Sequence, residues 1–154
     1  MLGVMSNDAP TPTVSFSLTF KDAAAALDVY KRAFGAEELF RMPMPGGGTA
    51  HAEFRLGNTR IFMSDESEEW GAFAMPEGTT ASCLFSIETD DCDASHAKAL
   101  REGAESISEP EDQFWGCRSS VIRDPFGYRW SFAQITEQLS PEEVMKRANE
   151  LFGA

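Results

Sequence analysis

The first predicted strand is marked by strict alternation of apolar and polar residues over positions 13–20, with Val14, Phe16, Leu18 and Phe20 on one side. A period of two is typical of a strand that buries one face. A helix follows, because Asp22 is a good capping residue and Gly35 a good helix end. We expect it to bury Ala26, Leu27, Tyr30, Ala33 and Phe34. Strands over 38–42, 49–56 and 60–64 complete the unit.

The same order of elements begins again at residue 83. A strand over 83–88 precedes a helix that is capped by Asp91 and ended by Gly103, and strands over 104–108, 117–123 and 128–134 follow, with a loop at 110–116. We expect the helix to bury Ala94, Ala97 and Leu100. The two caps lie 69 residues apart, the helix-ending glycines 68 and the turn glycines 70. The repeat predicts an α+β fold of tandem β-α-β-β-β modules, whose curved mixed sheets surround a cleft.

The predicted organisation is one compact domain with four parts: a first module at 13–66, a connecting loop at 67–80, a second module at 81–135 and a C-terminal helix within 136–154. Ser140, Pro141 and Glu143 form a strong helix start. An apolar stripe on this helix needs a groove on its own chain or on a second subunit, which predicts a homodimer. The stripe comprises Val144, Met145, Ala148, Leu151 and Phe152. Whether the modules pair within a chain or swap between subunits stays open.

Charge excludes several classes of partner. The 154 residues carry 25 acidic and 13 basic side chains, a formal net charge of −12, with 42% apolar residues that can supply a core. Such a surface repels phosphate groups, so we expect no nucleic acid and no membrane as partners. No export signal or membrane-spanning run is evident, which predicts a cytoplasmic protein. Cys83, Cys92 and Cys117 are expected to be reduced, with Cys83 buried in an apolar run.

Four stretches carry a resemblance to a known family: YKRAFGAE at 30–37, HAE at 51–53, EDQFWG at 111–116 and DPFGYRW at 124–130. With the duplicated modules they resemble the vicinal oxygen chelate superfamily, which includes glyoxalase I, extradiol dioxygenases and bleomycin-resistance proteins. They look closest to its PhnB-like, glyoxalase-like branch. The resemblance covers about residues 13–147. Because the superfamily hosts isomerases, dioxygenases, epimerases and drug binders, the fold does not select an activity.

The resemblance also implies where a metal would be bound, on the inward faces of the first and last strands of each module. Counting from the helix caps and turn glycines places Ser15, Leu84, Ile61 and Ser131 there. None is an ordinary metal ligand, and a divalent site needs about three converging ligands. We therefore expect no metal and no other cofactor.

His51 and Glu53 are the candidate catalytic residues. They share one face of their strand, opposite Ala52 and Phe54, so they face the cleft if Phe54 packs under the helix. There His51 is placed to act as a general base or a hydrogen-bond donor, with Glu53 orienting it. The alternative is a solvated strand face. His96 is expected on the protein surface.

Several other residues are candidates for lining the cleft. Two aromatic residues beside Gln113 predict either a lid over an apolar ligand, with Trp115 closing the cleft, or a loop pinned to the core. Arg41 and Arg118, with Arg129, are candidates for holding an anion, or are paired with surface acids. Asp124 and the three residues after it are expected to form only a turn. The predicted lining is Ser15, Ser17, Arg41, Leu84, Ser86, Glu88, Gln113, Trp115, Arg118 and Ser131.

Two functions compete. In the first, the protein binds a small, partly apolar molecule in a metal-free cleft, consistent with the missing ligands and the aromatic loop. In the alternative it is an enzyme of the lyase, isomerase or dioxygenase type acting on a small oxygenated substrate. His51 would then be the base or part of a metal site.

Overall fold

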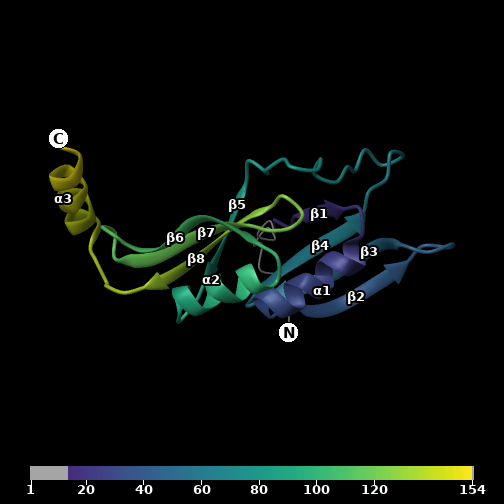
Figure 1. Cartoon of the computed structure of the whole chain (residues 1–154), viewed down its shortest axis with the longest axis horizontal. Helices are drawn as coiled ribbons and strands as arrows, with labels where there is room; N and C mark the ends of the chain where they lie inside the picture. Colours follow the sequence, from purple (N-terminus) through teal and green to yellow (C-terminus); the bar gives the residue numbers. More distant parts are fainter. Residues whose placement is uncertain (1–13, 154) are drawn as a thin grey trace, which may run out of the picture.

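Two four-stranded sheets of the same topology form the body of the protein in the computed structural model, which describes residues 14–153 (Figure 1). The strand orders are β1-β4-β3-β2 and β5-β8-β7-β6, here called sheet 1 and sheet 2. In each, the first strand pairs parallel with its neighbour and the other pairs are antiparallel. The strands are β1 (Ser17–Phe20), β2 (Glu37–Pro43), β3 (Thr49–Leu56), β4 (Thr59–Asp65), β5 (Leu84–Glu88), β6 (Glu105–Gln113), β7 (Cys117–Arg123) and β8 (Arg129–Ile135). The predicted α+β class and tandem modules are confirmed.

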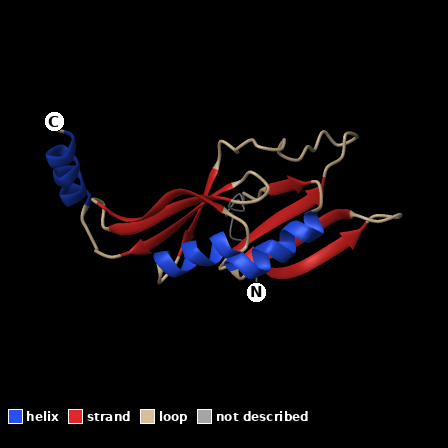
Figure 2. Ribbon diagram, in the orientation of Figure 1, coloured by secondary structure: helices blue, strands red, loops and turns tan. Residues whose placement is uncertain are grey.

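Each module has one helix, which begins at an aspartate as predicted. The helices are α1 (Ala23–Phe34) and α2 (Cys92–Arg101). The Asp22 and Asp91 carboxylates each accept a hydrogen bond from the backbone N–H three residues on, at 2.9 Å. Gly35 ends α1 with a φ of 71°, which glycine adopts without steric cost. The two helices lie end to end along one side of the molecule (Figure 2), so the opposite face of each sheet carries no helix of its module.

The core lies between helices and sheets and continues across the boundary between modules. Its largest side chains are Leu18, Phe20, Leu27, Tyr30, Phe54, Ile61, Met63, Ile122, Tyr128, Trp130 and Phe132. Phe34 of α1 contacts Trp130 of β8, with ring centroids 4.7 Å apart. Phe16, just before β1, stacks on Phe85 of β5 at 5.0 Å. The two modules therefore bury their apolar surfaces in common.

Two strands differ in length from the prediction. β1 begins at Ser17, and Val14 is exposed rather than part of the strand; position 13 lies outside the described residues. β6 continues to Gln113, through much of the predicted loop at 110–116. Pro110 is tolerated because β6 is an edge strand whose pairing with β7 is irregular between Ser108 and Glu111.

α2 turns a different face to the core than the sequence predicts. It buries Cys92, His96 and Ala99, whereas Ala94 and Ala97 are exposed. The prediction that His96 lies on the surface is therefore wrong. Because alanines occur on both sides of this helix, the apolar pattern gave little contrast between the two faces.

The thiols also differ from the prediction. Cys83, one residue before β5, is exposed rather than buried, while Cys92 at the start of α2 is fully buried. All three cysteines are free.

The C-terminal helix α3 (Pro141–Phe152) stands apart from both modules, at the end of the molecule beyond sheet 2 (Figure 1). Ser140 caps it by accepting a hydrogen bond from the Glu143 N–H at 3.2 Å. Arg147 ties it to its own chain through Glu137 at 2.8 Å and the Phe114 carbonyl at 3.5 Å. None of its residues is buried. Within residues 14–153, no helix is long and apolar enough to cross a membrane.

Candidate functional site

The helix-free face of sheet 1 gathers the chemically versatile side chains of the first module. Ala52 and Phe54 of β3 are buried beneath α1, so the alternating His51 and Glu53 point to the opposite face. This is the orientation on which the predicted roles of His51 and Glu53 depend.

Apolar side chains from the two neighbouring strands, β2 and β4, surround this pair. Strand register sets Phe40, Glu53, Phe62 and Ser17 in one row across β2, β3, β4 and β1. Met42 is the register partner of His51. The His51 ring lies 5.2 Å from the Phe62 ring and 6.3 Å from the Phe40 ring, centroid to centroid. We call the set Ser17, Phe40, Met42, His51, Glu53, Arg60 and Phe62 the open face of sheet 1.

A chain of polar contacts runs through the open face. His51 Nε2 lies 3.1 Å from Glu53 Oε1, and the Arg60 guanidinium donates to Glu53 Oε2 at 3.4 Å. Arg60 also lies over the Phe62 ring, 5.2 Å from its centroid. Because a carboxylate only accepts, the bonded Nε2 carries the hydrogen, and Nδ1 of neutral His51 keeps its lone pair. The arrangement fixes the imidazole and leaves it one free acceptor.

Arg60 is the member of this chain that sequence reasoning missed. The predicted pair of His51 and Glu53 had no visible third partner. Arg60 lies two residues before Phe62 on β4, so its position on the same face was available from strand alternation. The missing information was the pairing of β3 with β4, which brings it to Glu53.

The equivalent face of sheet 2 has different chemistry. Ser86 of β5 pairs in register with Ser131 of β8, which pairs with Val121 of β7. Leu84 and Glu88 lie on the same face of β5, and Gln113 reaches it from the end of β6. This face presents the hydroxyls of Ser86 and Ser131, the carboxylate of Glu88 and the aliphatic side chains of Leu84 and Val121.

Other predicted lining residues lie elsewhere. Arg41 is on the helix side of sheet 1 and pairs with Glu38 at 2.9 Å. Arg118 is on the helix side of sheet 2, where Asp93 and Asp112 hold it; this pairing lowers the pKa of Asp93. Both therefore follow the alternative that the sequence left open, ion pairing.

The remaining two lining residues are also not brought to His51. Ser15 precedes β1, in exposed chain. Trp115 is at the turn between β6 and β7, near α3 and far from sheet 1 in Figure 1. Within one chain, Trp115 closes no cleft over the open face.

The turn before β8 does more than reverse the chain. Asp124 is buried and accepts hydrogen bonds from Tyr30 Oη at 2.6 Å, Trp130 Nε1 at 2.9 Å, and the backbone N–H groups of Phe126 and Tyr128. Burial raises the pKa of Asp124, and burial beside Asp124 raises that of Tyr30 well above its ordinary value. Asp124 thus joins α1 of the first module to β8 of the second.

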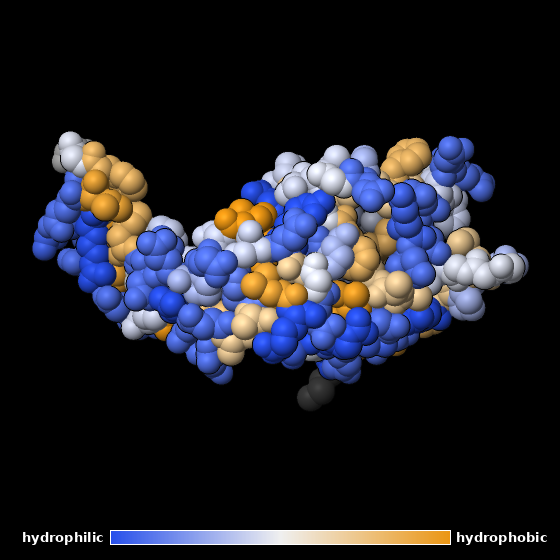
Figure 3. All heavy atoms as spheres, in the orientation of Figure 1, coloured by the Kyte–Doolittle hydropathy of each residue, from blue (hydrophilic) through white to orange (hydrophobic). Residues whose placement is uncertain are grey.

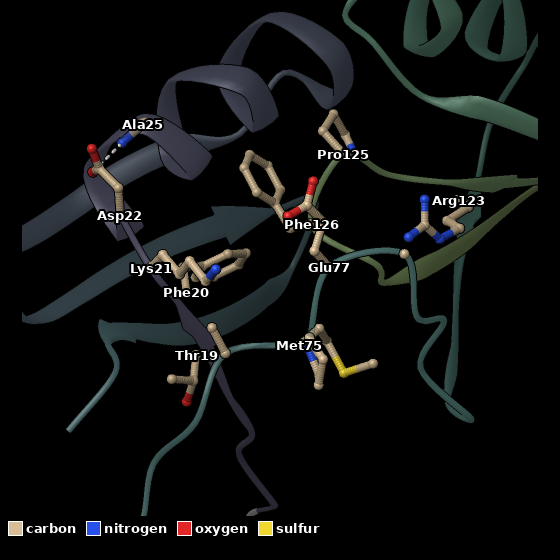
Figure 4. A pocket seen from close by; sticks show the side chains of 13 residues that line it. Thr19, Phe20, Lys21, Asp22, Ala25, Met75, Glu77, Arg123, Pro125 and Phe126 are labelled. Atoms are coloured by element: carbon tan, nitrogen blue, oxygen red, sulfur yellow. Dashed lines mark hydrogen bonds between the residues drawn. The ribbon is translucent and has the colours of Figure 1, made fainter. Parts of the chain in front are cut away.

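A cavity of about 340 Å³ lies beside this junction and was not predicted (Figure 4). The side chains of Phe20, Met75 and Phe126 form its apolar part, with Lys21 and Glu77 at its rim. Asp22 at the same rim is engaged in capping α1. Arg123 is engaged with the Thr79 carbonyl at 2.7 Å.

Comparison with known proteins identifies the family. The sequence model of the Glyoxalase/Bleomycin resistance protein/Dioxygenase superfamily matches residues 13–132. The chain belongs to this superfamily. An uncharacterized protein of Mycobacterium tuberculosis, Rv0887c, is 35% identical over 136 residues, which cover 86% of this chain and 80% of the relative.

Solved structures share the superfamily fold. A glyoxalase/bleomycin resistance protein/dioxygenase from Nocardioides superposes with a TM-score of 0.64 at 21% identity, covering 88% of this chain and 91% of its own. A protein from Bacillus cereus described as a putative 3-demethylubiquinone-9 3-methyltransferase, PhnB protein, gives a TM-score of 0.64 at 14% identity, covering 80% and 99%. At these identities the likeness is one of fold.

The donor set of this superfamily member does not fit a divalent metal. On the helix-free faces, register pairs Ser17 with Phe62 in one module and Ser86 with Ser131 in the other, and Glu88 is the one carboxylate that β5 adds to the second of these faces. Ile61, predicted for the first of them, is buried on the helix side, because the modules are offset by 69 residues here and not by the 70 of the turn glycines. Hydroxyls and a phenyl ring are poor ligands for zinc, nickel or iron. Among residues 14–153, no three His, Cys, Asp or Glu side chains converge as a metal site.

Proposed function

We propose that this superfamily member binds a small, partly apolar molecule on the open face of sheet 1, with a polar group of the ligand at His51. The observation that carries the proposal is the His51–Glu53–Arg60 chain set between the rings of Phe40 and Phe62. Ligand sites combine mostly apolar walls with a few oriented polar groups, and this face has both. The net charge of −12 favours neutral or cationic ligands over anions.

A second candidate function is catalysis at the same place. Glu53 holds the Nε2 side of His51, so Nδ1 is free to take a proton from a bound substrate, and Glu53 stabilises the imidazolium that results. This chemistry is metal-free proton transfer, as in an isomerase or a lyase. It needs the same open face and the same orientation of His51, so one experiment addresses both functions.

A thermal-shift screen tests binding. The panel consists of small phenols, aromatic ketones and aromatic amines that are neutral or cationic at pH 7. A ligand present at 100 times its Kd stabilises the folded protein by about 2.7 kcal/mol, which is easily detected as a rise in Tm. Each hit is then titrated calorimetrically against variants of the open face.

Three variants decide where and how a hit binds. We expect His51→Ala to weaken binding about tenfold or more, and Glu53→Gln to weaken it less, because the amide still contacts the ring. Glu38→Gln is the matched control, since it makes the same change on the helix side of the same sheet. Unchanged affinity in His51→Ala would place the ligand elsewhere, for instance in the cavity of Figure 4.

The same hits separate binding from catalysis. They are incubated with wild type and His51→Ala, and products are sought by mass spectrometry. A product that disappears in His51→Ala under saturating ligand supports His51 as the base. Product formation that survives the substitution removes His51 from the mechanism, and binding without product supports the first function.

A further inference from the structure

The cavity beside the Asp124 turn is separate from the open face of sheet 1 (Figure 4). It lies between the end of β1, the start of α1, the connecting loop at 74–78 and the turn before β8. None of its lining residues belongs to the open face. Because β4 lies between β1 and β3, two strand spacings, or about 10 Å, separate Thr19 at the cavity from His51. A molecule bound in this cavity would therefore occupy a second site.

The connecting loop, which forms one wall of the cavity, is held against the second module by close contacts. Gly127 has a φ of +96°, and a Cβ at this position would lie 2.8 Å from the Thr79 carbonyl oxygen and 3.2 Å from Met75. Glycine permits both the conformation and the close approach. The Ala81 N–H donates to the Gly127 carbonyl at 2.7 Å, and the Arg123 guanidinium donates to the Thr79 carbonyl at 2.7 Å. The cavity is therefore preformed by the fold.

The interior of the cavity is suited to one flat apolar group. The Phe20 and Phe126 rings meet edge to face with centroids 5.3 Å apart, and the Met75 thioether lies beside them. Aromatic rings and thioethers both pack well against a further aromatic ring. The volume of about 340 Å³ is at the lower end of the range for small-molecule pockets. The interior thus favours a ligand with a single ring.

The rim of the cavity offers one unpaired charge of each sign. Of its four charged residues, Asp22 caps α1, and Arg123 is bound to a loop carbonyl and to a carboxylate. The other two are Lys21 and Glu77, and within residues 14–153 neither side chain has an ion-pair or hydrogen-bond partner. One ammonium and one carboxylate together complement the two charged groups of a zwitterion.

The charge of the whole protein also favours a ligand without net charge. The surface is largely hydrophilic (Figure 3), and the chain carries a net charge of −12. This charge repels a simple anion that approaches the cavity. A simple cation would be attracted to Glu77 but would meet the like charge of Lys21 at the same rim. A zwitterion satisfies both rim residues and avoids both repulsions.

We propose that this cavity is a second ligand site, which binds a small zwitterion carrying one aromatic ring, of the aromatic amino acid type. The ring packs against Met75 and the rings of Phe20 and Phe126. The carboxylate of the ligand pairs with Lys21, and its ammonium pairs with Glu77. This inference goes beyond the proposed function, because the two sites share no residue and neither needs the other.

Methyl NMR of the full chain tests where the ligand binds. Protein labelled with ¹³C-methyl methionine is titrated with L-phenylalanine to millimolar concentration, and the Met75 signal is assigned with Met75→Leu. Met75 lines the cavity, whereas Met42 is the register partner of His51 on the open face. We expect the ring current of the ligand to shift the Met75 signal and to leave the Met42 signal in place. An unmoved Met75 signal would overturn the proposal.

Competing ligands that lack one charge test the assigned chemistry. Phenethylamine lacks the carboxylate, and 3-phenylpropionate lacks the ammonium. We expect Lys21→Met to weaken L-phenylalanine about threefold and to leave phenethylamine unchanged, because an exposed ion pair contributes only modestly. Glu77→Gln should weaken L-phenylalanine to a similar extent and leave 3-phenylpropionate unchanged. The matched controls are Lys98→Met on α2 and Glu69→Gln in the connecting loop, which lie outside the cavity and should change nothing.

Two outcomes of these titrations would contradict the assignment. Equal effects of Lys21→Met on L-phenylalanine and phenethylamine would show that Lys21 does not meet the carboxylate. A loss of L-phenylalanine affinity in His51→Ala would place the ligand on the open face. Failure of L-phenylalanine to bind would leave any open-face hit of the thermal-shift screen unaffected, so the second site and the proposed function can fail independently.

Discussion

The two modules have the same topology but differ in the faces that carry no helix. In each, an aspartate caps the helix and the first strand pairs parallel with the last. Sheet 1 carries aromatic rings around His51, Glu53 and Arg60, whereas the same face of sheet 2 carries Ser86, Ser131 and Glu88. The comparison shows that the repeat supplies a scaffold, and that individual strand positions give each module its chemistry.

The hairpin turns before the last strands differ just as clearly. In the second module, Asp124 is buried and receives four hydrogen bonds, two of them from side chains of the core. In the first module, Asn58 occupies an exposed two-residue turn, and its side chain accepts a hydrogen bond from its own neighbour, the Thr59 hydroxyl, at 3.3 Å. The turn of the second module therefore links the two modules through the hydrogen bonds of Asp124, whereas the Asn58 side chain in the first module makes no such link.

The largest expected effect on stability comes from removing the Asp124 carboxylate. Asp124→Ala leaves the buried Tyr30 hydroxyl and Trp130 N–H without their acceptor, so we expect a loss of about 3–5 kcal/mol in unfolding free energy. Asn58→Ala should change it by less than about 0.5 kcal/mol. Urea unfolding measures both. Similar losses from the two substitutions would contradict the asymmetry of the turns.

The pH dependence of stability tests how the burial of Asp124 affects the folded state. Because burial raises the pKa of Asp124, the folded state binds its proton more tightly than the unfolded state does. The contribution of this group to stability is therefore fully present below the unfolded pKa, near 4, and is lost as the pH rises through the folded value. Relative to Asp124→Asn, wild type should lose stability between pH 4 and neutral pH in urea titrations. A gain instead would mean that the four hydrogen bonds outweigh burial.

The smallest expected effect concerns the two helix-free faces. Phe62 and Ser131 are equivalent positions, each in register with a serine of the first strand. Phe62→Ser gives sheet 1 the residue of sheet 2, and we expect it to weaken ligand binding about tenfold, or about 1.4 kcal/mol, through lost apolar contact. Ser131→Ala should leave affinity unchanged. Calorimetric titration with a hit from the screen decides, and an effect of Ser131→Ala equal to that of Phe62→Ser would move the ligand towards sheet 2.

Local sequence signals predicted most of the fold. Helix capping acts between residues that are three positions apart, as at Asp22 and Asp91, and the end of α1 depends on the conformation of Gly35 itself. These helix ends could therefore be predicted without knowledge of any tertiary contact. The errors occurred where local contrast was weak. In α2 the alanines gave two possible apolar stripes, and packing against β6 and β7 selected the one with His96.

The candidate site was predicted in part. Strand alternation placed His51 and Glu53 on one face and fixed their orientation once Phe54 was buried. Strand alternation could not predict that Arg60 contacts Glu53, because that contact depends on the register between β3 and β4. It also could not exclude Arg41 and Arg118 from the site, because their positions follow from ion pairs with Glu38 and Asp93. The predicted closure by Trp115 fails within one chain for a similar reason, since the position of a turn relative to another module is not encoded locally.

By itself, the sequence determined the module repeat, the helix ends, the family and the shared face of His51 and Glu53, because periodicity and capping act over a few residues. The tertiary structure alone decided that Asp124 links α1 to β8, that Arg60 supports Glu53, and that β1, the connecting loop and the turn before β8 enclose a cavity. These features join residues from different elements of the chain. Only the pairing of strands and the packing of modules fixes such distances, since side-chain contacts between elements follow from the whole fold.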